Sequence, residues 1–203
     1  MRKNEKRLNN IGFNLISGTD EAGRGPVAGP VVAASVILNN ELNYNYINDS
    51  KQLSEKKRIE AYNKLKKEAI SISYIIIDNN KIDEINILEA TKLAMIKSIE
   101  SLKIKPEFAL IDQVELKEID IPTLSIIKGD KLSKSIAAAS IVAKVVRDEL
   151  MYEYDKIYPN YDFKNNKGYL TKKHREAIKK YGPIEIHRKT FEPIKSYYNK
   201  GSK

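Results

Sequence analysis

Runs of apolar residues divide the chain into short stretches typical of strands and longer stretches with helical spacing. The short runs are rich in β-branched residues and predict strands at 15–20, 30–38, 72–77, 108–111 and 123–127. Apolar positions three and four residues apart predict helices at 54–69, 85–102, 135–154 and 171–181, with a short one after Pro193. The stretch 135–154 is apolar enough to form a mostly buried helix.

The order of these elements predicts a mixed α/β sheet with helices on its faces. The first two strands are close enough in sequence to pair antiparallel, whereas the later ones require parallel crossovers through helices. We expect residues 1–159 to form this α/β domain and residues 160–203 to form a small helical appendage packed on it.

Positive charge is concentrated in the appendage. The 203 residues carry a formal net charge of +9, and residues 160–203 contain 12 basic and 4 acidic side chains. The same segment contains five of the 12 tyrosines. Basic side chains interleaved with aromatic ones are typical of surfaces that bind nucleic acid, although a solvated lysine-rich helix face has the same composition.

Composition excludes several classes of site and compartment. The chain has no cysteine and only two histidines, which excludes disulfide scaffolds, thiol nucleophiles and zinc–thiolate sites. The N-terminus lacks the apolar segment of a signal peptide, and the longest apolar run, 27–38, is too short to span a membrane. We therefore expect a cytoplasmic protein. A monomer is expected because no pattern indicates a dimer interface.

Four carboxylates stand at predicted strand ends. Asp20 and Glu21 close the first strand, Asp112 closes the fourth and Asp130 follows the fifth. Ends of neighbouring strands converge, and acids that meet there repel one another unless a cation lies between them. Oxygen ligands alone favour Mg²⁺ or Mn²⁺, and two such ions would suit phosphodiester hydrolysis. The alternative is that these are ordinary turn acids.

Several ordered motifs resemble those of ribonuclease HII, the type 2 ribonuclease H. The resembling segments are 18–26, 49–54, 86–95, 110–112, 128–130, 137–148, 167–171 and 187–193. The resemblance implies a ribonuclease H-like fold and an endoribonuclease that hydrolyses the RNA strand of RNA–DNA hybrids. It also implies nicking on the 5′ side of a single ribonucleotide in duplex DNA, leaving 5′-phosphate and 3′-hydroxyl ends.

The resemblance assigns roles to individual residues. It implies that the four strand-end acids, Asp20, Glu21, Asp112 and Asp130, are the catalytic ligands of two Mg²⁺ or Mn²⁺ ions. 

A second group of residues would bind substrate. Gly23, Arg24 and Gly25 would contact the ribose 2′-hydroxyl, Tyr169 would stack on the sugar of the next deoxynucleotide, and Lys51 would contact a phosphate. The pair formed by the glycine loop and Tyr169 would thus read an RNA-to-DNA step.

Other residues are ambiguous or depart from the family pattern. Gln113 stands where glycine is usual, and Asn166 where histidine is usual. Asp148 lies inside a predicted helix, and we expect it to pair with Arg147 or Lys144 rather than with a metal. 

The two histidines have functional and structural readings. A general-acid role for His174 or His187 is possible, but we favour capping or packing for His174 and structural hydrogen bonding for His187.

Two alternatives stay open. A type 3 ribonuclease H shares the Asp-Glu start but usually carries an extra N-terminal domain, for which the residues before the first strand are too few. A non-catalytic module that binds RNA–DNA hybrids would tolerate loss of the four acids, and all four are present. No sliding-clamp peptide is evident in the tail.

Overall fold

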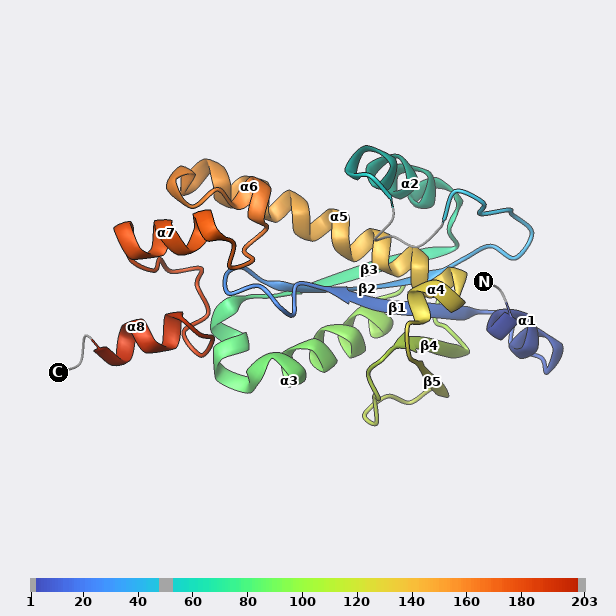
Figure 1. Ribbon diagram of the computed structural model, residues 1–203. Coiled ribbons are helices and arrows are strands. Elements are labelled where there is room, and N and C mark those ends of the chain that lie inside the picture. The colour runs from blue at the N-terminus through green and yellow to red at the C-terminus, as the bar shows by residue number, and fades with distance from the viewer. Residues whose placement is uncertain (1–2, 48–52, 201–203) are drawn as a thin grey trace.

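A computed structural model describes residues 3–47 and 53–200 and confirms the mixed α/β class. Its sheet has the strand order β3-β2-β1-β4-β5 (Figure 1). The strands are β1 (Ile16–Ala22), β2 (Val31–Ile37), β3 (Ser71–Ile77), β4 (Phe108–Asp112) and β5 (Thr123–Ile126). The longer helices are α2 (Glu55–Glu68), α3 (Asn79–Glu100), α5 (Lys134–Ile157) and α7 (Lys172–Tyr181). The short ones are α1 (Lys3–Asn10), α4 (Gly129–Leu132), α6 (Phe163–Asn166) and α8 (Ile194–Lys200), with a 3-10 turn η1 (Pro159–Tyr161).

The strand directions agree with the sequence prediction only in part. β1 pairs antiparallel with β2 and parallel with β4, as expected, and β5 runs parallel to β4. The prediction was wrong for β3, which is antiparallel to β2. The connection from β2 to β3, which includes α2, starts and finishes at the same end of the sheet. There the Ile70 amide bonds to the Ile37 carbonyl. The prediction of a helical crossover was also wrong between β4 and β5, where loop 113–122 buries Val114 and Leu116 against the α3 side of the core.

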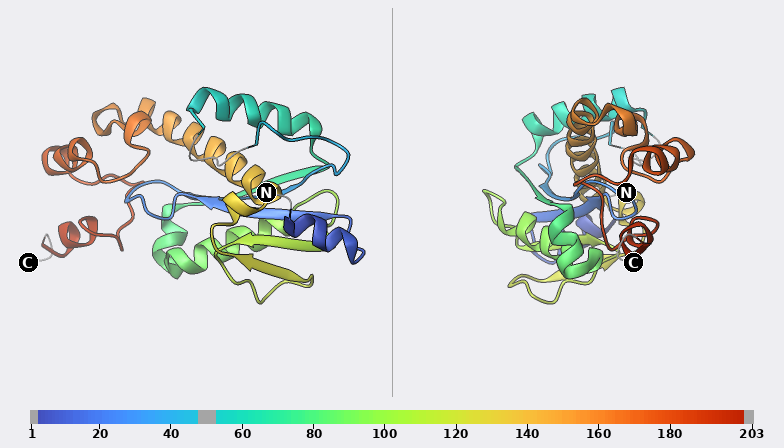
Figure 2. Two further views of the ribbon diagram at one scale, coloured as in Figure 1. Left: turned by 45° about the vertical axis from the view of Figure 1, so that its right-hand side comes forward. Right: turned by 90° about the vertical axis from the view of Figure 1, so that its left-hand side faces the viewer.

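The sheet lies between two helical layers. α5 and α2 cover one face and α3 covers the other (Figures 1 and 2). The alanines of α5 let this helix lie close to the strands, and at its start Gly18 of β1 leaves no room for a Cβ atom, which would overlap the backbone of Ser135. None of the helices within the described residues is long and apolar enough to cross a bilayer.

Helix α3 begins earlier than the spacing predicted. Asp78 caps it by accepting from the Lys81 amide at 2.8 Å. The backbone then breaks at Asn86, which has φ 66°, and the Asn86 side chain accepts from the amides of Leu88 and Glu89. The predicted start at residue 85 therefore coincides with this internal cap.

The C-terminal helices gather at the end of the sheet opposite α1 (Figures 1 and 2). An apolar cluster joins them to α5 and to the β1–β2 connection, with members that include Val27, Met151, Phe163, Ile178 and Ile194. The cluster places the C-terminal helices against α5 and the β1–β2 connection.

Helix α1 was missed because its sequence is almost entirely polar. It is held by Glu5, whose Oε1 accepts from the Ser133 hydroxyl at 2.7 Å and from the Ser135 amide at 3.1 Å. The contact that fixes this helix is thus formed with residues about 130 positions away, which local periodicity cannot show.

The close approach at Gly18 gives a stability test. We expect Gly18→Ala to lower the free energy of unfolding by about 3 kcal/mol or more, because the backbone of α5 must move to admit a methyl group. Gly12→Ala is the control, since Gly12 has φ 103° with open space around it and should cost only about 1–2 kcal/mol. Urea unfolding of the two variants measures the difference, and equal losses would contradict this account of the packing.

Candidate active site

A pocket of about 440 Å³ opens where β1 and β4 end. Its wall combines the ends of both strands, the segment after β1, two helices and the loop before α7. The lining residues are Asp20, Glu21, Ala22, Gly23, Arg24, Gly25, Arg58, Asp112, Gln113, Ser140, Lys144, Arg147 and Tyr169. Three of the four predicted acids and the whole predicted glycine loop therefore share one cavity with Tyr169.

Strand register brings the acids together. The parallel ladder pairs Thr19 with Ile111, so Asp20 and Asp112 follow side by side on adjacent strands. Asp20 Oδ1 accepts from the Glu21 amide at 2.7 Å, and Asp112 Oδ1 accepts from the Gly129 amide at 2.6 Å. The Ser140 hydroxyl of α5 also bonds to the Asp20 carboxylate.

The charges of these acids are costly in the absence of a cation. Burial, followed by repulsion from Glu21 and Asp112, raises the pKa of Asp20 well above its usual value. Burial also raises the pKa of Glu21, although Arg24 opposes the shift. Arg24 Nη1 lies 3.5 Å from Glu21 Oε1, while Glu21 Oε2 is buried and has no hydrogen-bond partner among the described residues. This donor set suits a hard divalent cation, although no group of three or more acidic or histidine side chains in residues 3–47 and 53–200 is already arranged to hold one.

Asp130 lies apart from the pocket lining. It is buried in α4 and is not among the described residues that line the cavity. The amide of its neighbour Gly129 bonds to Asp112, which connects α4 to the end of β4.

Two buried arginines hold the segment that contains Gly23, Arg24 and Gly25. Arg188 donates to the carbonyls of Gly23, Arg24 and Gly29 at 2.6, 2.9 and 3.0 Å. Arg147 donates to the carbonyls of Pro30, Ala28 and Lys167 at 3.0, 3.3 and 2.9 Å. These six hydrogen bonds hold in place the backbone of the segment from Gly23 to Pro30 and the Lys167 carbonyl.

Burial lowers the pKa of both guanidinium groups, which stay protonated at neutral pH. It lowers the pKa of Arg147 to about 10, and burial together with the charge of Arg147 lowers the pKa of Arg188 to about 9. A side chain at Gly23 would overlap the Arg147 guanidinium, and its φ of 102° favours glycine. Glycine is thus required here by both space and conformation.

Tyr169 is held beside this loop. Tyr169 is 48% exposed and lines the pocket, and a Cβ atom on Gly25 would lie 3.4 Å from the Tyr169 ring. Asn166 fixes the turn before it, because the Asn166 side chain accepts from the Gly168 amide at 2.8 Å and donates to the Tyr161 carbonyl at 2.6 Å. Asn166, which stands where histidine is usual, therefore holds the turn that leads into Tyr169.

Gln113 lines the pocket with a left-handed backbone, φ 54°. This is the conformation that glycine adopts without strain, which gives a physical reason for the usual glycine. Here the strand-end conformation is kept with a larger side chain.

The two histidines form a buried chain of hydrogen bonds that ends at Tyr169. The Ile184 amide donates to His187 Nδ1 at 2.9 Å, so His187 carries its proton on Nε2. His187 Nε2 then donates to His174 Nε2 at 3.1 Å, and His174 Nδ1 donates to the Tyr169 carbonyl at 2.9 Å. Burial lowers the pKa of both, that of His187 to about 4. The structural reading of both histidines agrees with this geometry.

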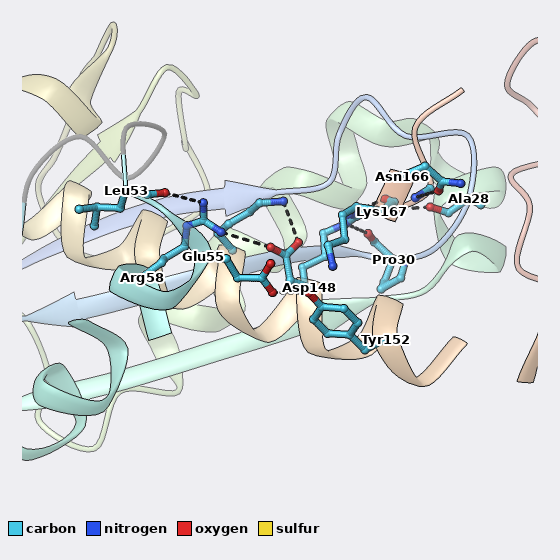
Figure 3. Close-up of polar contacts among 12 residues, drawn as sticks. Ala28, Pro30, Leu53, Glu55, Arg58, Asp148, Tyr152, Asn166 and Lys167 are labelled. Atoms are coloured by element: carbon cyan, nitrogen blue, oxygen red, sulfur yellow. Dashed lines mark hydrogen bonds and ion pairs between the residues drawn. The ribbon is translucent and has the colours of Figure 1, made fainter. Parts of the chain in front are cut away.

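Lys144, one of the two predicted partners, pairs with Asp148 at 2.7 Å. The prediction of a pair with Arg147 is wrong, because the Arg147 guanidinium bonds to carbonyl groups instead. The second partner of Asp148 is Arg58, at 3.3 Å (Figure 3). Arg58 and Lys144 were missed as pocket residues because nothing in their local sequence shows that two helices bring them together. Lys51 lies outside the described residues.

Comparisons with known proteins agree with the resemblance in the sequence. A profile of the family described as Ribonuclease HII matches residues 17–194. The ribonuclease HII of Caldanaerobacter subterraneus subsp. tengcongensis is 55% identical over 94% of this chain and 79% of its own length. That of Acholeplasma laidlawii is 53% identical over 94% of this chain and 93% of its own length.

Solved structures agree with the fold. Ribonuclease H2 from Pyrococcus horikoshii superposes with a TM-score of 0.80 at 26% identity. The match covers 94% of this chain and 100% of the Pyrococcus horikoshii chain. Bst-RNase HIII in complex with Mn²⁺ gives a TM-score of 0.68 at 18% identity, over 95% of this chain and 71% of its own. The second similarity concerns the fold alone, so the type 3 alternative has far less support than type 2.

The neutral histidine chain predicts a pH dependence of stability. A base whose pKa is lowered by folding stabilises the protein above its unfolded pKa, 6.5, and this contribution is lost as pH falls toward 4. Between pH 6.5 and 4.5 we expect the wild type to lose about 2–3 kcal/mol more unfolding free energy than His187→Gln. Urea unfolding of the wild type and His187→Gln across this pH range measures the difference in unfolding free energy. Equal losses in the two proteins, or imidazole NMR signals that titrate near pH 6.5, would show that His187 is not held neutral.

Proposed function

Because the chain belongs to the ribonuclease HII family, endoribonucleases that act on the RNA strand of RNA–DNA hybrids, we propose that Asp20, Glu21, Asp112 and Asp130 are its catalytic metal ligands. The single observation that carries the proposal is the register that sets Asp20 beside Asp112, with Glu21 in the same buried pocket. Asp130 is included because its neighbour Gly129 bonds to Asp112.

The family depends on divalent metal ions, and we propose two Mg²⁺ or Mn²⁺ ions for this chain. When bound, such ions activate a water molecule and stabilise the leaving 3′-oxygen. The protein's own contribution is to hold these carboxylates in place and to bury Asp20 and Glu21, whose pKa values are raised. Glu21 Oε2, which has no hydrogen-bond partner among the described residues, is an oxygen that could bind a metal ion. Hydrolysis would leave 5′-phosphate and 3′-hydroxyl ends.

Substrate recognition is proposed for the other side of the pocket. Gly23, Arg24 and Gly25 offer backbone groups to a ribose 2′-hydroxyl, and the half-exposed ring of Tyr169 beside Gly25 offers a surface for the next, deoxy, sugar. This arrangement supports nicking on the 5′ side of a single ribonucleotide in duplex DNA. Lys51 is proposed as a phosphate contact by its motif alone.

The basic appendage over 160–203 is proposed to add contacts to the nucleic-acid backbone. We also propose that the protein acts as a monomer in the cytoplasm.

Asp20→Asn tests the metal site. We expect kcat/KM on duplex DNA with one ribonucleotide to fall at least about a hundredfold with Mg²⁺ or Mn²⁺, because one ligand oxygen is replaced by a weaker amide. Unfolding free energy measured in EDTA at pH 7 should rise, since a buried, repelled carboxylate is removed. Asp120→Asn, at an exposed acid outside the pocket, is the matched control. Undiminished cleavage by Asp20→Asn would refute the assignment.

Tyr169→Ala tests the junction reader. We expect kcat/KM to fall about tenfold or more at a single ribonucleotide, because a stacking surface is lost, and to fall less on a hybrid with a continuous RNA strand. Tyr169→Phe should retain the preference. Tyr181→Ala removes a tyrosine of similar exposure that is not among the described residues lining the pocket. An equal loss on both substrates would leave Tyr169 without a role in reading the junction.

A further inference from the structure

The carboxylate of Asp83, in the second turn of α3, receives three hydrogen bonds from the residues that follow Arg188. Its Oδ2 accepts from the Lys189 amide at 2.8 Å, and its Oδ1 accepts from the Thr190 amide at 2.9 Å and the Thr190 hydroxyl at 2.6 Å. We infer that Asp83 is a positioning residue for the reaction, which acts through Arg188 to hold the glycine loop at the pocket. This inference rests on the proposed role of that loop in substrate recognition.

Asn79 holds the chain on the other side of Arg188. It lies four residues before Asp83, so both side chains belong to the same face of α3. The buried Asn79 Nδ2 donates to the Glu185 carbonyl at 2.8 Å and to the His187 carbonyl at 3.4 Å. The start of α3 therefore fixes the backbone both before and after Arg188.

Arg188 transmits this hold to the glycine loop. Its side chain is fully buried and donates to the carbonyls of Gly23, Arg24 and Gly29 at 2.6, 2.9 and 3.0 Å. Its own backbone amide donates to the Val27 carbonyl at 2.9 Å. All four acceptors lie in the segment that contains the glycine loop, so a displacement of the Arg188 backbone would release or move that segment.

The Asp83 charge also stabilises the arginine that it positions. The side-chain hydrogen bonds of Arg188 go to neutral carbonyl groups, and its guanidinium carbon lies over the Phe191 ring, 4.9 Å from the ring centre. Burial and the charge of Arg147 lower the pKa of Arg188 to about 9, and Asp83 opposes this shift. Asp83 is thus oriented by amide donors and offsets part of the cost of burying the guanidinium.

The break in α3 at Asn86 separates this contact from the part of the helix that covers the sheet. After the break, Ala90, Ala94 and Met95 pack into the core. Before it, residues 79–85 lie at the end of the sheet that carries the C-terminal helices (Figures 1 and 2). The break lets these residues follow a different direction from the rest of α3, toward the segment that contains Arg188.

Hydrogen exchange of Asp83→Asn tests the link without any need for cleavage. We expect the amides of residues 23–30 to exchange about tenfold faster than in the wild type, because an amide group accepts the bonds from residues 189 and 190 less well than a carboxylate does. The amides of β4 should keep their rates. Mass spectrometry of peptides from the intact, folded protein measures both segments.

Cleavage kinetics of Asp83→Asn test what the link is for. We expect kcat to fall about tenfold or more with KM changed less than about twofold, because the reacting ribose is misplaced rather than unbound. The fall should be equal on duplex DNA with one ribonucleotide and on a hybrid with a continuous RNA strand, since both present a 2′-hydroxyl to the glycine loop. This pattern differs from that expected for Tyr169→Ala, which affects the single ribonucleotide more.

Two control variants separate positioning from charge and from stability. Glu84→Gln removes the same charge from the next residue, whose carboxylate pairs with Lys81 at 2.7 Å. Gly12→Ala destabilises the protein at the other end of the sheet. Both should keep kcat within about twofold of the wild type. Thr190→Val removes one of the three donors to Asp83 and should lower kcat by about two- to threefold, so it decides the matter if Asp83→Asn does not fold.

Each outcome supports or overturns the inference. It is wrong if Asp83→Asn and Thr190→Val exchange and cleave as Glu84→Gln does, or if Gly12→Ala reproduces the loss of kcat. Faster exchange with normal kcat, or a lower kcat with normal exchange, would also overturn it. A normal Asp83→Asn beside an inactive Asp20→Asn would overturn this inference alone, whereas an active Asp20→Asn would overturn the proposed metal site and leave the exchange result to decide the link.

Discussion

The site depends on two buried guanidinium groups that hold the segment from Gly23 to Pro30. Arg147 and Arg188 together bond to five carbonyls of this segment and to Lys167. One arginine comes from α5 and the other from the chain after α7, so the segment is fixed against both the α/β domain and the appendage. Without these donors, five carbonyl groups, four of them in buried hydrogen bonds, would lose partners at once, each buried one at a cost of about 1–3 kcal/mol.

The same two arginines explain why the appendage cannot be treated as a separate attachment. Arg188 reaches back from the appendage to the loop beside the acids, and the Val27 amide bonds to the Gly168 carbonyl at 3.0 Å. The histidine chain continues this link to the Tyr169 carbonyl. The position of Tyr169 relative to the glycine loop is thus set by buried polar bonds, which specify geometry more strictly than apolar packing does.

Much of this site could be predicted from the chain because its residues obey local rules. Asp20, Glu21 and Asp112 stand at the ends of apolar runs, and parallel pairing then brings them together. Gly23 was predicted through the resemblance of its motif, and the structure adds the positive φ and the Arg147 side chain packed against it. The helix of 135–154 is visible because its first half is rich in Ala, Ile and Val and carries no charge before Lys144.

Other features could not be predicted, because their partners are distant in sequence. Arg58 lies 90 residues before Asp148, and in the sequence it is one of several basic residues on a lysine-rich helix. Arg188 lies 165 residues after Gly23.

Electrostatics sets the state of the acids in the pocket. Burial, together with repulsion from Glu21 and Asp112, raises the pKa of Asp20, and burial raises the pKa of Glu21. Arg24, 3.5 Å from Glu21, opposes the second shift. On the proposed function, divalent cations bound by these acids would offset their repulsion. The free energy that the folded protein gives up at this pocket would then be recovered when the substrate enters with its metal ions.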